Sequence, residues 1–380
     1  MIYVLLTWLA APILYLRLTL RRRTVDRRRV LLIQTAKIGD LVCTTPVIAS
    51  LKASWPDCHL TVMVNPLCAP LLAHDPVVDD LWSVPAADWR GFAGKLRLLR
   101  RLHAGHFDDC IVLSPNTAFL LLPLWAGIPR RAAMSSNFPS RSLDRCARFL
   151  THRERHRAGR LVLDTELELL RQLGCTQLTQ RKSLRAAPHA DAAISAFLGG
   201  RSAPRIGIGI SSGNKLKTLS PEQLTELCEN LLAALPHDLV LIGTAADRPI
   251  AAEILAKCGN RGRILDAAGA FALDVLPALM PRLDGYFGVD SGVTYIADTF
   301  DVPTVDLMGP ANADDQRPTG EHAIVLRSEL PCAPCSHAFR APYHCQRGDR
   351  ACVVQALPAT LAQAVVACLA AAASRTSRAS

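Results

Sequence analysis

The residues best suited to chemistry lie at the ends of short apolar runs. In the first such place, Lys37, Gly39 and Asp40 follow an unbroken apolar run at residues 30–33. A run of this kind is typical of a strand buried on both faces of a parallel sheet. A carboxylate at the end of such a strand can reach a ligand and accept a proton from its hydroxyl group. Asp40 could equally be only the N-cap of the following helix, and the local pattern leaves both interpretations open.

A second stretch repeats this arrangement. Asp290, Ser291 and Gly292 follow the apolar run at residues 285–289. Small residues at the start of a helix leave backbone N–H groups accessible, which suits the phosphates of a diphosphate. The alternative is that Asp290 only caps the helix. Because the two stretches lie far apart in the chain, we expect two doubly wound α/β domains that face one cleft.

A third group lies between these stretches. Ser211, Ser212 and Gly213 follow an apolar run at residues 206–210, and Lys217 comes shortly after them. A lysine ammonium is a compact charge that can stabilise negative charge on a leaving phosphate, although a solvated lysine before a helix would have the same pattern. The glycines of this segment do not match the G-x-G-x-x-G spacing, which disfavours a dehydrogenase.

Further apolar runs supply the strands that must position these residues. They fall at 60–64, 80–84 and 109–114 in the first half and at 239–243, 263–266 and 302–308 in the second. Short, largely apolar runs that are separated by amphipathic segments predict parallel sheets covered by helices. The loop after the run at 109–114 contains Asn116, which would face the same cleft as Asp40.

The composition indicates an anionic partner. The chain has 380 residues, half of them hydrophobic, which is enough for two cores, and its formal net charge is +10. No stretch interleaves aromatic with basic residues as single-strand binding proteins do, so nucleic acid is not expected as a partner. Anionic lipid and phosphorylated glycolipid are better candidates, because arginines cluster near the N-terminus.

The N-terminal segment combines an apolar run with these arginines. Residues 1–15 are almost wholly apolar, and Arg17 is followed by arginine triplets at 21–23 and 27–29. A secretory signal carries its charge before the apolar core, so export is not expected. The arginines suit an anionic cytoplasmic membrane surface, and we expect a peripheral or marginally spanning anchor. The alternative is a hydrophobic helix that packs on the protein itself.

Two other segments have more than one interpretation. Residues 137–160 are rich in Arg, His and Ser, which is typical of a solvated mobile loop and would also suit an anionic acceptor. Near the C-terminus, four cysteines are spaced so that they could bind zinc, form two disulfides or stay as free thiols. These cysteines are Cys332, Cys335, Cys345 and Cys352.

Taken in order, the motifs resemble those of the lipopolysaccharide heptosyltransferases of glycosyltransferase family nine. The resemblance covers most of residues 29–355, and its specificity comes from the ordered set rather than from any one motif. The matching segments are Lys37-Ile-Gly-Asp40, Thr44-Thr45-Pro46, Trp55-Pro56-Asp57, Asn65, Ser211-Ser212-Gly213, Lys217, Leu241-Ile-Gly243, Asp290-Ser291-Gly292, Pro303-Thr304-Val305, Gly309-Pro310 and Pro331-Cys-Ala-Pro-Cys335.

The resemblance implies two Rossmann-like domains of the GT-B type and inverting transfer of a heptose from ADP-heptose to a lipopolysaccharide core acceptor. Asp40 would be the general base, and Lys217 would contact the donor diphosphate. The other residues implied on the donor side are Ser211, Ser212, Gly213, Asp247, Asp290, Ser291, Gly292 and Tyr295. Those expected on the acceptor side are Lys37, Gly39, Thr44 and Asn116.

Two donor-side positions depart from the family pattern. Tyr295 stands where the family usually has histidine, and Leu219 stands where it often has tryptophan. A family member that uses another nucleotide sugar for surface glycolipid or polysaccharide synthesis is therefore an alternative. A catalytically silent glycolipid-binding homologue is another, although the presence of Asp40 and Lys217 argues against it. No D-x-D motif follows a strand, so we expect no metal cofactor for catalysis, with structural zinc possible only at the cysteines.

These interpretations divide the chain into four parts. Residues 1–24 form a hydrophobic and basic membrane-association segment, and residues 25–185 form an acceptor-binding domain. Residues 200–354 form a nucleotide-sugar-binding domain, and residues 355–373 form a helix that crosses back to the first domain. The expected location is the cytoplasmic face of a bacterial inner membrane.

Overall fold

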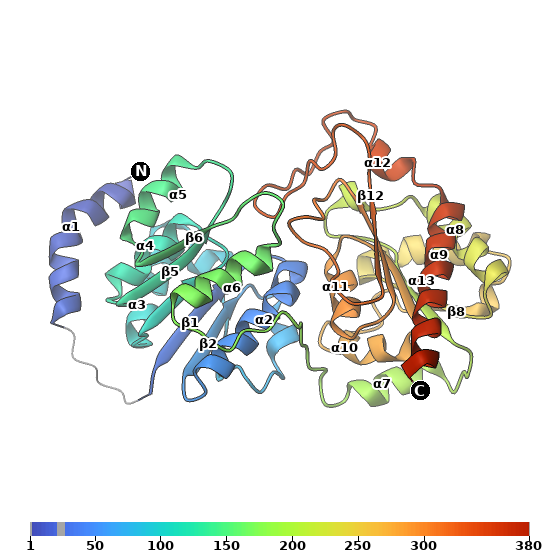
Figure 1. The fold of residues 1–380 in the computed structure, drawn as a ribbon, viewed down its shortest axis with the longest axis horizontal. Helices are drawn as coiled ribbons and strands as arrows, with labels where there is room; N and C mark the ends of the chain where they lie inside the picture. Colours follow the sequence, from blue (N-terminus) through green and yellow to red (C-terminus); the bar gives the residue numbers. More distant parts are fainter. Residues whose placement is uncertain (1, 21–26, 380) are drawn as a thin grey trace. The chain divides into compact units, whose positions relative to one another are not determined.

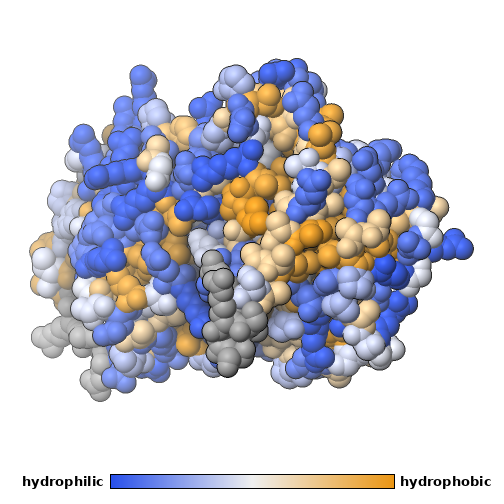
Figure 2. All heavy atoms as spheres, turned by 45° about the vertical axis from the view of Figure 1, so that its right-hand side comes forward, coloured by the Kyte–Doolittle hydropathy of each residue, from blue (hydrophilic) through white to orange (hydrophobic). Residues whose placement is uncertain are grey.

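The computed structural model describes residues 2–20 and 27–379 and divides into two compact units (Figure 1). The N-terminal unit is Met1–Ser183 and the C-terminal unit is Leu184–Ser380. Each unit contains one six-stranded sheet in which every strand pairing is parallel. On the face drawn in Figure 2, hydrophilic residues predominate and apolar residues gather in patches.

The sheet of the N-terminal unit is built around its first strand. The strands are β1 (Arg29–Gln34), β2 (His59–Val64), β3 (Asp80–Ser83), β4 (Asp109–Val112), β5 (Arg130–Ser135) and β6 (His152–Arg155). Their order is β3-β2-β1-β4-β5-β6, which is the order of a doubly wound nucleotide-binding sheet. Successive strands are added on one side of β1 as far as β3, and from β4 onward they are added on its other side. The carboxyl ends of β1 and β4 therefore mark the place where ligands bind in such folds.

Helices cover this sheet in two groups. They are α1 (Ile2–Thr19), α2 (Ile38–Ser54), α3 (Gly91–Ala104), α4 (Thr117–Trp125), α5 (Arg141–Cys146) and α6 (Val162–Gln172), with 3₁₀ turns η1 (Ala69–Leu72), η2 (Ala86–Asp88) and η3 (Ala147–Phe149). Helix α2 packs with α6, and α3 packs with α4, while α1 lies against α4. Leu31 and Ile33 of β1 share a core with Leu98 of α3 and Phe119 of α4.

Helix α2 contains a proline that its own sequence accommodates. Pro46 has no N–H group, so the carbonyl of Val42 loses its normal helical donor. The hydroxyl of Thr45 donates to that carbonyl instead, at 2.8 Å. The Thr45 oxygen also accepts from the backbone N–H of Ser183, at 3.1 Å. The Thr-Pro pair therefore keeps α2 continuous and ties it to the end of the unit.

The sheet of the C-terminal unit repeats the same topology. Its strands are β7 (Arg205–Gly209), β8 (Asp238–Ile242), β9 (Ile264–Asp266), β10 (Gly285–Val289), β11 (Thr304–Gly309) and β12 (Ala323–Arg327). Their order is β12-β11-β10-β7-β8-β9, so the switch point of this sheet lies between β7 and β10. Five of these strands coincide with stretches that the sequence analysis identified, and β12 is the strand of this sheet that it missed.

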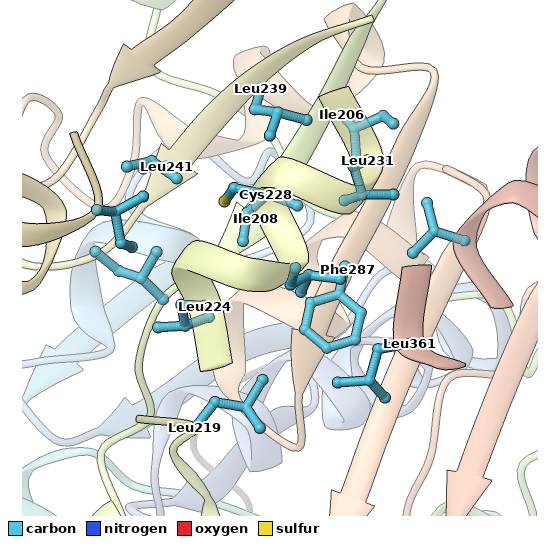
Figure 3. Packing of buried hydrophobic residues seen from close by; sticks show 14 of the residues in the cluster. Ile206, Ile208, Leu219, Leu224, Cys228, Leu231, Leu239, Leu241, Phe287 and Leu361 are labelled. Carbon is cyan, nitrogen blue, oxygen red and sulfur yellow. The ribbon is translucent and has the colours of Figure 1, made fainter. Parts of the chain in front are cut away.

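The helices of this unit pack around a large apolar core (Figure 3). They are α7 (Ala190–Leu198), α8 (Pro221–Ala234), α9 (Arg248–Lys257), α10 (Leu276–Leu279), α11 (Gly292–Thr299), α12 (Ala351–Val354) and α13 (Pro358–Ala379), with 3₁₀ turns η4 (Lys215–Lys217), η5 (Ala245–Asp247), η6 (Arg261–Arg263) and η7 (Met280–Arg282). We expected residues 355–373 to cross back to the first domain. Leu361 and Val365 of α13 instead lie in this core, where the helix packs against α8 and β10–β12.

The N-terminal helix α1 packs on the N-terminal unit along one side only. Trp125 of α4 donates its indole N–H to the Thr7 hydroxyl at 2.9 Å, and Trp8 makes an edge contact with Phe149. Val4 and Leu14 are buried in the same core as β1. Within residues 2–20 and 27–374, Ile2–Thr19 is the single helix long and apolar enough to cross a membrane by length and composition.

The arginines that we assigned to a lipid surface have a different environment. Arg27 donates to the carbonyl of Cys58 at 2.8 Å, and Arg28 binds the buried carboxylate of Asp109 at 2.7 Å. Arg29 donates to the carbonyl of Gly105 at 2.7 Å. This triplet therefore ties together the amino ends of the strands, because those ends leave backbone carbonyls and carboxylates that need donors. The triplet at 21–23 lies outside the described residues.

Residues 137–160 are more ordered than the solvated loop that their composition suggested. They include α5, η3 and the edge strand β6. His156 is buried, and its ring Nδ1 lies 2.9 Å from the Thr165 hydroxyl. Arg153 pairs with Asp144 at 2.7 Å. Hydrogen bonds and ion pairs of this kind cannot be predicted from composition, because they join residues that only the fold brings together.

Candidate active site

The ends of β1, β2 and β4 are tied together at one edge of the N-terminal sheet. The backbone N–H of Thr35 donates to the Ser114 hydroxyl at 2.8 Å, which joins the end of β1 to the end of β4. Asn65, directly after β2, donates to the carbonyls of Thr35 and Ala36. These bonds fix the start of α2, where the expected base lies.

Asp40 occupies the third position of α2, because the helix already begins at Ile38. One of its carboxylate oxygens accepts from the backbone N–H of Lys37 at 3.1 Å. Gly39, expected on the acceptor side, is therefore the second residue of this helix. The carboxylate is half-buried, while the Lys37 side chain is exposed. Asp40 thus helps to cap its own helix and also lies at the switch point, so the two interpretations are compatible.

A buried polar network lies behind Asp40. The Gln34 side chain donates to the Thr44 hydroxyl at 2.9 Å, and Thr44 donates to Glu166 of α6 at 3.2 Å. Thr44 is only 1% exposed, so its side chain supports α2 and does not present itself to an acceptor. Burial, reinforced by the negative charge of Asp40, raises the pKa of Glu166 well above its ordinary value. Burial therefore favours the protonated, uncharged form of Glu166.

The remaining acceptor-side residue, Asn116, begins α4 at the end of β4. Its side-chain oxygen accepts from the backbone N–H of Phe119 at 3.0 Å, which makes it the N-cap of that helix. The residue is half-buried and lies next to Ser114, at the same sheet edge as Thr35. The structure therefore brings Asn116 to the β1–β4 switch point, with part of its side chain committed to the cap.

In the C-terminal unit, an ion pair occupies the corresponding switch point. Lys217, in η4 after β7, binds one carboxylate oxygen of Asp290, which directly follows β10. The Tyr295 hydroxyl donates to the other oxygen at 2.7 Å. Lys217 and Asp290 are mostly buried, and Tyr295 is 1% exposed. Tyr295, which stands where the family pattern has histidine, therefore has its hydroxyl group hydrogen-bonded to the Asp290 carboxylate.

The loops on either side complete this half-site. The Ser212 hydroxyl donates to the carbonyl of Asp290 at 3.4 Å, which joins the end of β7 to the end of β10. Ser291 is the N-cap residue of α11, and Gly292 is the first residue of that helix. Gly213 has open space around its Cα atom. The first N–H groups of α11 have no partner within the helix, so they can donate to an anion.

Asp247 lies at the end of the neighbouring strand and is almost fully buried. Its carboxylate accepts from the backbone N–H of Thr244 at 2.9 Å and from the Thr244 hydroxyl at 2.7 Å. Lys215 lies 3.2 Å from its other oxygen. Burial favours the neutral acid, but hydrogen bonds from Thr244 and Ser211 outweigh it and lower the pKa of Asp247. The carboxylate is thus largely committed to holding its own loop.

Sequence reasoning missed a buried acid beneath the ion pair. Asp306 of β11 is fully buried, and neither of its carboxyl oxygens has a hydrogen-bond partner among the described residues. Burial, together with the charge of Asp290, raises the pKa of Asp306 well above its ordinary value, which favours the uncharged acid. The signal was present in the sequence as one acid within the apolar run at 302–308.

The four clustered cysteines line one small pocket with Leu216 and Pro310. Burial, with smaller contributions from the three other cysteines, raises the pKa of Cys352. Within the described parts of the chain, however, no group of three or more His, Cys, Asp or Glu side chains is placed to hold a metal ion. The cysteines are gathered but are not arranged as zinc ligands, and zinc stays a prediction for metal analysis.

Comparison with known proteins agrees with this geometry. The sequence pattern of glycosyltransferase family 9 (heptosyltransferase) matches residues 95–343. Lipopolysaccharide heptosyltransferase 2 of Salmonella typhimurium is 26% identical over 319 residues, which cover 79% of this chain and 88% of that protein.

Two solved structures share the fold. A family 9 glycosyl transferase from Veillonella parvula has a TM-score of 0.74 at 22% identity, covering 92% of this chain and 99% of that one. The Escherichia coli ADP-heptose LPS heptosyltransferase II has a TM-score of 0.70 at 21% identity, covering 90% and 98%. The two parallel sheets are therefore those of a GT-B fold. Because the family pattern spans most of the sequence, the chain belongs to glycosyltransferase family 9, the heptosyltransferase family.

Proposed function

We propose that this glycosyltransferase moves a heptose from ADP-heptose to the anionic core glycolipid of lipopolysaccharide, with inversion at the anomeric carbon. The observation that carries the proposal is the matched pair of switch points. One presents the half-buried carboxylate of Asp40, and the other presents Lys217 of η4, paired with Asp290 just before the start of α11. A base and an anion-binding group are the two parts that transfer from a nucleotide sugar needs.

On the acceptor side, Asp40 would take the proton of the attacking hydroxyl group. As that proton moves to the carboxylate, the hydroxyl oxygen forms a bond to the anomeric carbon from the face opposite the diphosphate. The hydrogen bond from the Lys37 N–H holds the carboxylate in place before the reaction. Glu166 lies behind α2, and burial raises its pKa well above the ordinary value. This favours an uncharged neighbour beside the Asp40 carboxylate.

On the donor side, the bond between the anomeric carbon and the diphosphate oxygen breaks, and ADP leaves with the electron pair. Lys217 is the cation placed to stabilise the new charge, together with the first N–H groups of α11. In the structure, Lys217 binds Asp290. A diphosphate would therefore compete with Asp290 for the ammonium, and the Tyr295 hydroxyl stabilises the carboxylate when the lysine turns away.

The test is release of nucleoside diphosphate from a panel of ADP- and UDP-sugars, with a truncated lipopolysaccharide core as acceptor. Release from ADP-heptose that depends on the acceptor supports the proposal. Release only from another donor favours the second candidate, a family member with a different nucleotide sugar, and the buried Tyr295 in the histidine position is the observation behind it. Donor binding without turnover on any acceptor would favour a silent glycolipid-binding protein.

We also propose that the protein works at the cytoplasmic face of a bacterial inner membrane. Support comes from α1, whose outward side chains remain exposed after its other side has packed on the unit. A shift of the purified protein into the pellet with anionic vesicles, but not with neutral ones, is the expected result. Equal recovery in the supernatant with both kinds of vesicle would contradict it.

A further inference from the structure

Helices α1, α3 and α4 enclose an apolar cavity that no part of the proposed reaction uses. Its volume is about 170 Å³, and its lining includes Leu6 of α1, Leu96 and Leu99 of α3, and Leu121 of α4. An apolar cavity of about 150 Å³ is already large enough to hold a small hydrocarbon such as benzene. The space is therefore suited to an apolar ligand and poorly suited to water.

One end of the cavity carries a positive charge. Lys95 lines it, with its ammonium group 4.3 Å from the centre of the Tyr3 ring and 3.3 Å from the carbonyl of Gly91. The neighbouring Phe92 also lines the cavity and is 72% exposed, which marks this end as the mouth. A ligand with an apolar body and an anionic end would fit both features.

The cavity adjoins an exposed apolar face on α1. Leu5, Leu9, Ile13 and Leu16 recur at helical spacing and are each at least 58% exposed. Leu6, which is 47% exposed, belongs to both this face and the cavity lining. A soluble protein rarely leaves such a row in water, and Arg17 at the end of the helix would suit an anionic lipid surface.

From this continuity of charge and apolar surface, we propose that the cavity between α1, α3 and α4 binds a segment of one fatty-acyl chain of an anionic bilayer phospholipid, with its phosphate at Lys95. The chain reaches the cavity from the bilayer past Leu6 without crossing water. The bound lipid fixes α1 on the unit and holds the enzyme at the membrane surface. This inference rests on the proposed membrane association and does not depend on the donor or acceptor sugar.

The test is photolabelling of the full-length protein with a phosphatidylglycerol that carries a diazirine at the end of one acyl chain, in vesicles of otherwise unlabelled lipid. We expect adducts within residues 92–99 and 117–125. Leu99→Trp fills the cavity, and a ring that displaces roughly two methylene groups should lower this labelling by about tenfold. Leu9→Trp, which adds the same ring to the exposed face, is the matched control and should leave it unchanged.

Lys95→Gln gives a second readout that does not depend on repacking. It should lower labelling by the anionic phospholipid several-fold and leave labelling by a diacylglycerol probe unchanged, because diacylglycerol has no phosphate for Lys95 to bind. Vesicle binding with adducts only on the outer face of α1 would overturn the cavity assignment alone. Loss of all vesicle binding would overturn membrane association as well, and protection of the cavity by the acceptor glycolipid or by dimerisation would assign it another occupant.

Discussion

The buried carboxyl group of Glu166 makes a quantitative prediction about stability. A carboxyl whose pKa is raised in the folded state holds a proton that the unfolded chain releases, so stability falls as pH rises above the ordinary value of 4.5. Each pH unit above 4.5 over which the folded protein keeps this proton lowers the free energy of unfolding by about 1.36 kcal/mol. Glu166→Gln is neutral at every pH and should remove this cost.

The substitution keeps most of the local contacts. A glutamine oxygen can accept the hydrogen bond that Thr44 donates to Glu166 at 3.2 Å. The new amide must bury N–H groups, which costs about 1 kcal/mol if they find only weak partners. Relative to wild type, the variant should therefore become more stable as the pH rises from 5 to 7, by up to about 1.4 kcal/mol for each pH unit.

The assay can be confined to the relevant unit. All five tryptophans, Trp8, Trp55, Trp82, Trp89 and Trp125, lie in the N-terminal unit, so urea unfolding followed by tryptophan fluorescence reports on that unit alone. Glu168→Gln, on the exposed side of the same helix, is the matched control and should change stability by less than about 0.5 kcal/mol at any pH. A constant difference between Glu166→Gln and wild type from pH 5 to pH 7 would refute the reasoning, because it would mean that Glu166 is charged in the folded protein.

Three further substitutions test the C-terminal unit. Compared with wild type, Asp306→Asn should gain more stability at pH 7 than at pH 5, because the variant has no proton to lose as the pH rises. Urea unfolding followed by circular dichroism at the two pH values measures this gain. If the gain were the same at both pH values, Asp306 would not be protonated in the folded protein. The Ser220 hydroxyl caps α8 by accepting from the Gln223 N–H, so Ser220→Ala should lower the free energy of unfolding by about 1 kcal/mol. An unchanged unfolding midpoint would mean that this capping box contributes little. Tyr295→Phe removes the hydrogen bond from the hydroxyl group to Asp290 and should lower kcat/KM for the donor by about tenfold without raising KM for the acceptor. A change in the acceptor KM alone would assign Tyr295 to the acceptor site and contradict its place on the donor side.

Much of the fold could be predicted from the sequence, because parallel strands leave a strong local signal. Apolar runs such as 30–33 and 285–289 coincide with the central strands β1 and β10. The residues after them lie at the switch points because connectivity alone determines where carboxyl ends meet. Strand β12 was missed although residues 323–326 are an unbroken apolar run, and the strand is only partly buried in the structure.

The parts that could not be predicted depend on contacts between distant residues. Arg28 suited a lipid surface by composition, but it pairs with Asp109, which lies about eighty positions away. The environment of Asp306 follows from its place beneath Asp290, and no local pattern shows that its carboxyl lacks partners. The packing of α13 was also not predictable, because an alanine-rich helix has no feature that selects one apolar surface over another.

The assignment of Asp40 as the base can be tested directly with Asp40→Asn. The asparagine oxygen can still accept from the Lys37 N–H, so the start of α2 is preserved while the basic carboxylate is lost. The measurement is acceptor-dependent release of ADP from ADP-heptose at saturating substrate, with the unfolding midpoint of the tryptophan-bearing unit as a check on folding. The account predicts a fall in kcat of about 10²- to 10⁴-fold with an unchanged midpoint. A variant that folds normally and keeps kcat within about threefold would show that Asp40 serves only to cap its helix, and it would contradict the proposed mechanism.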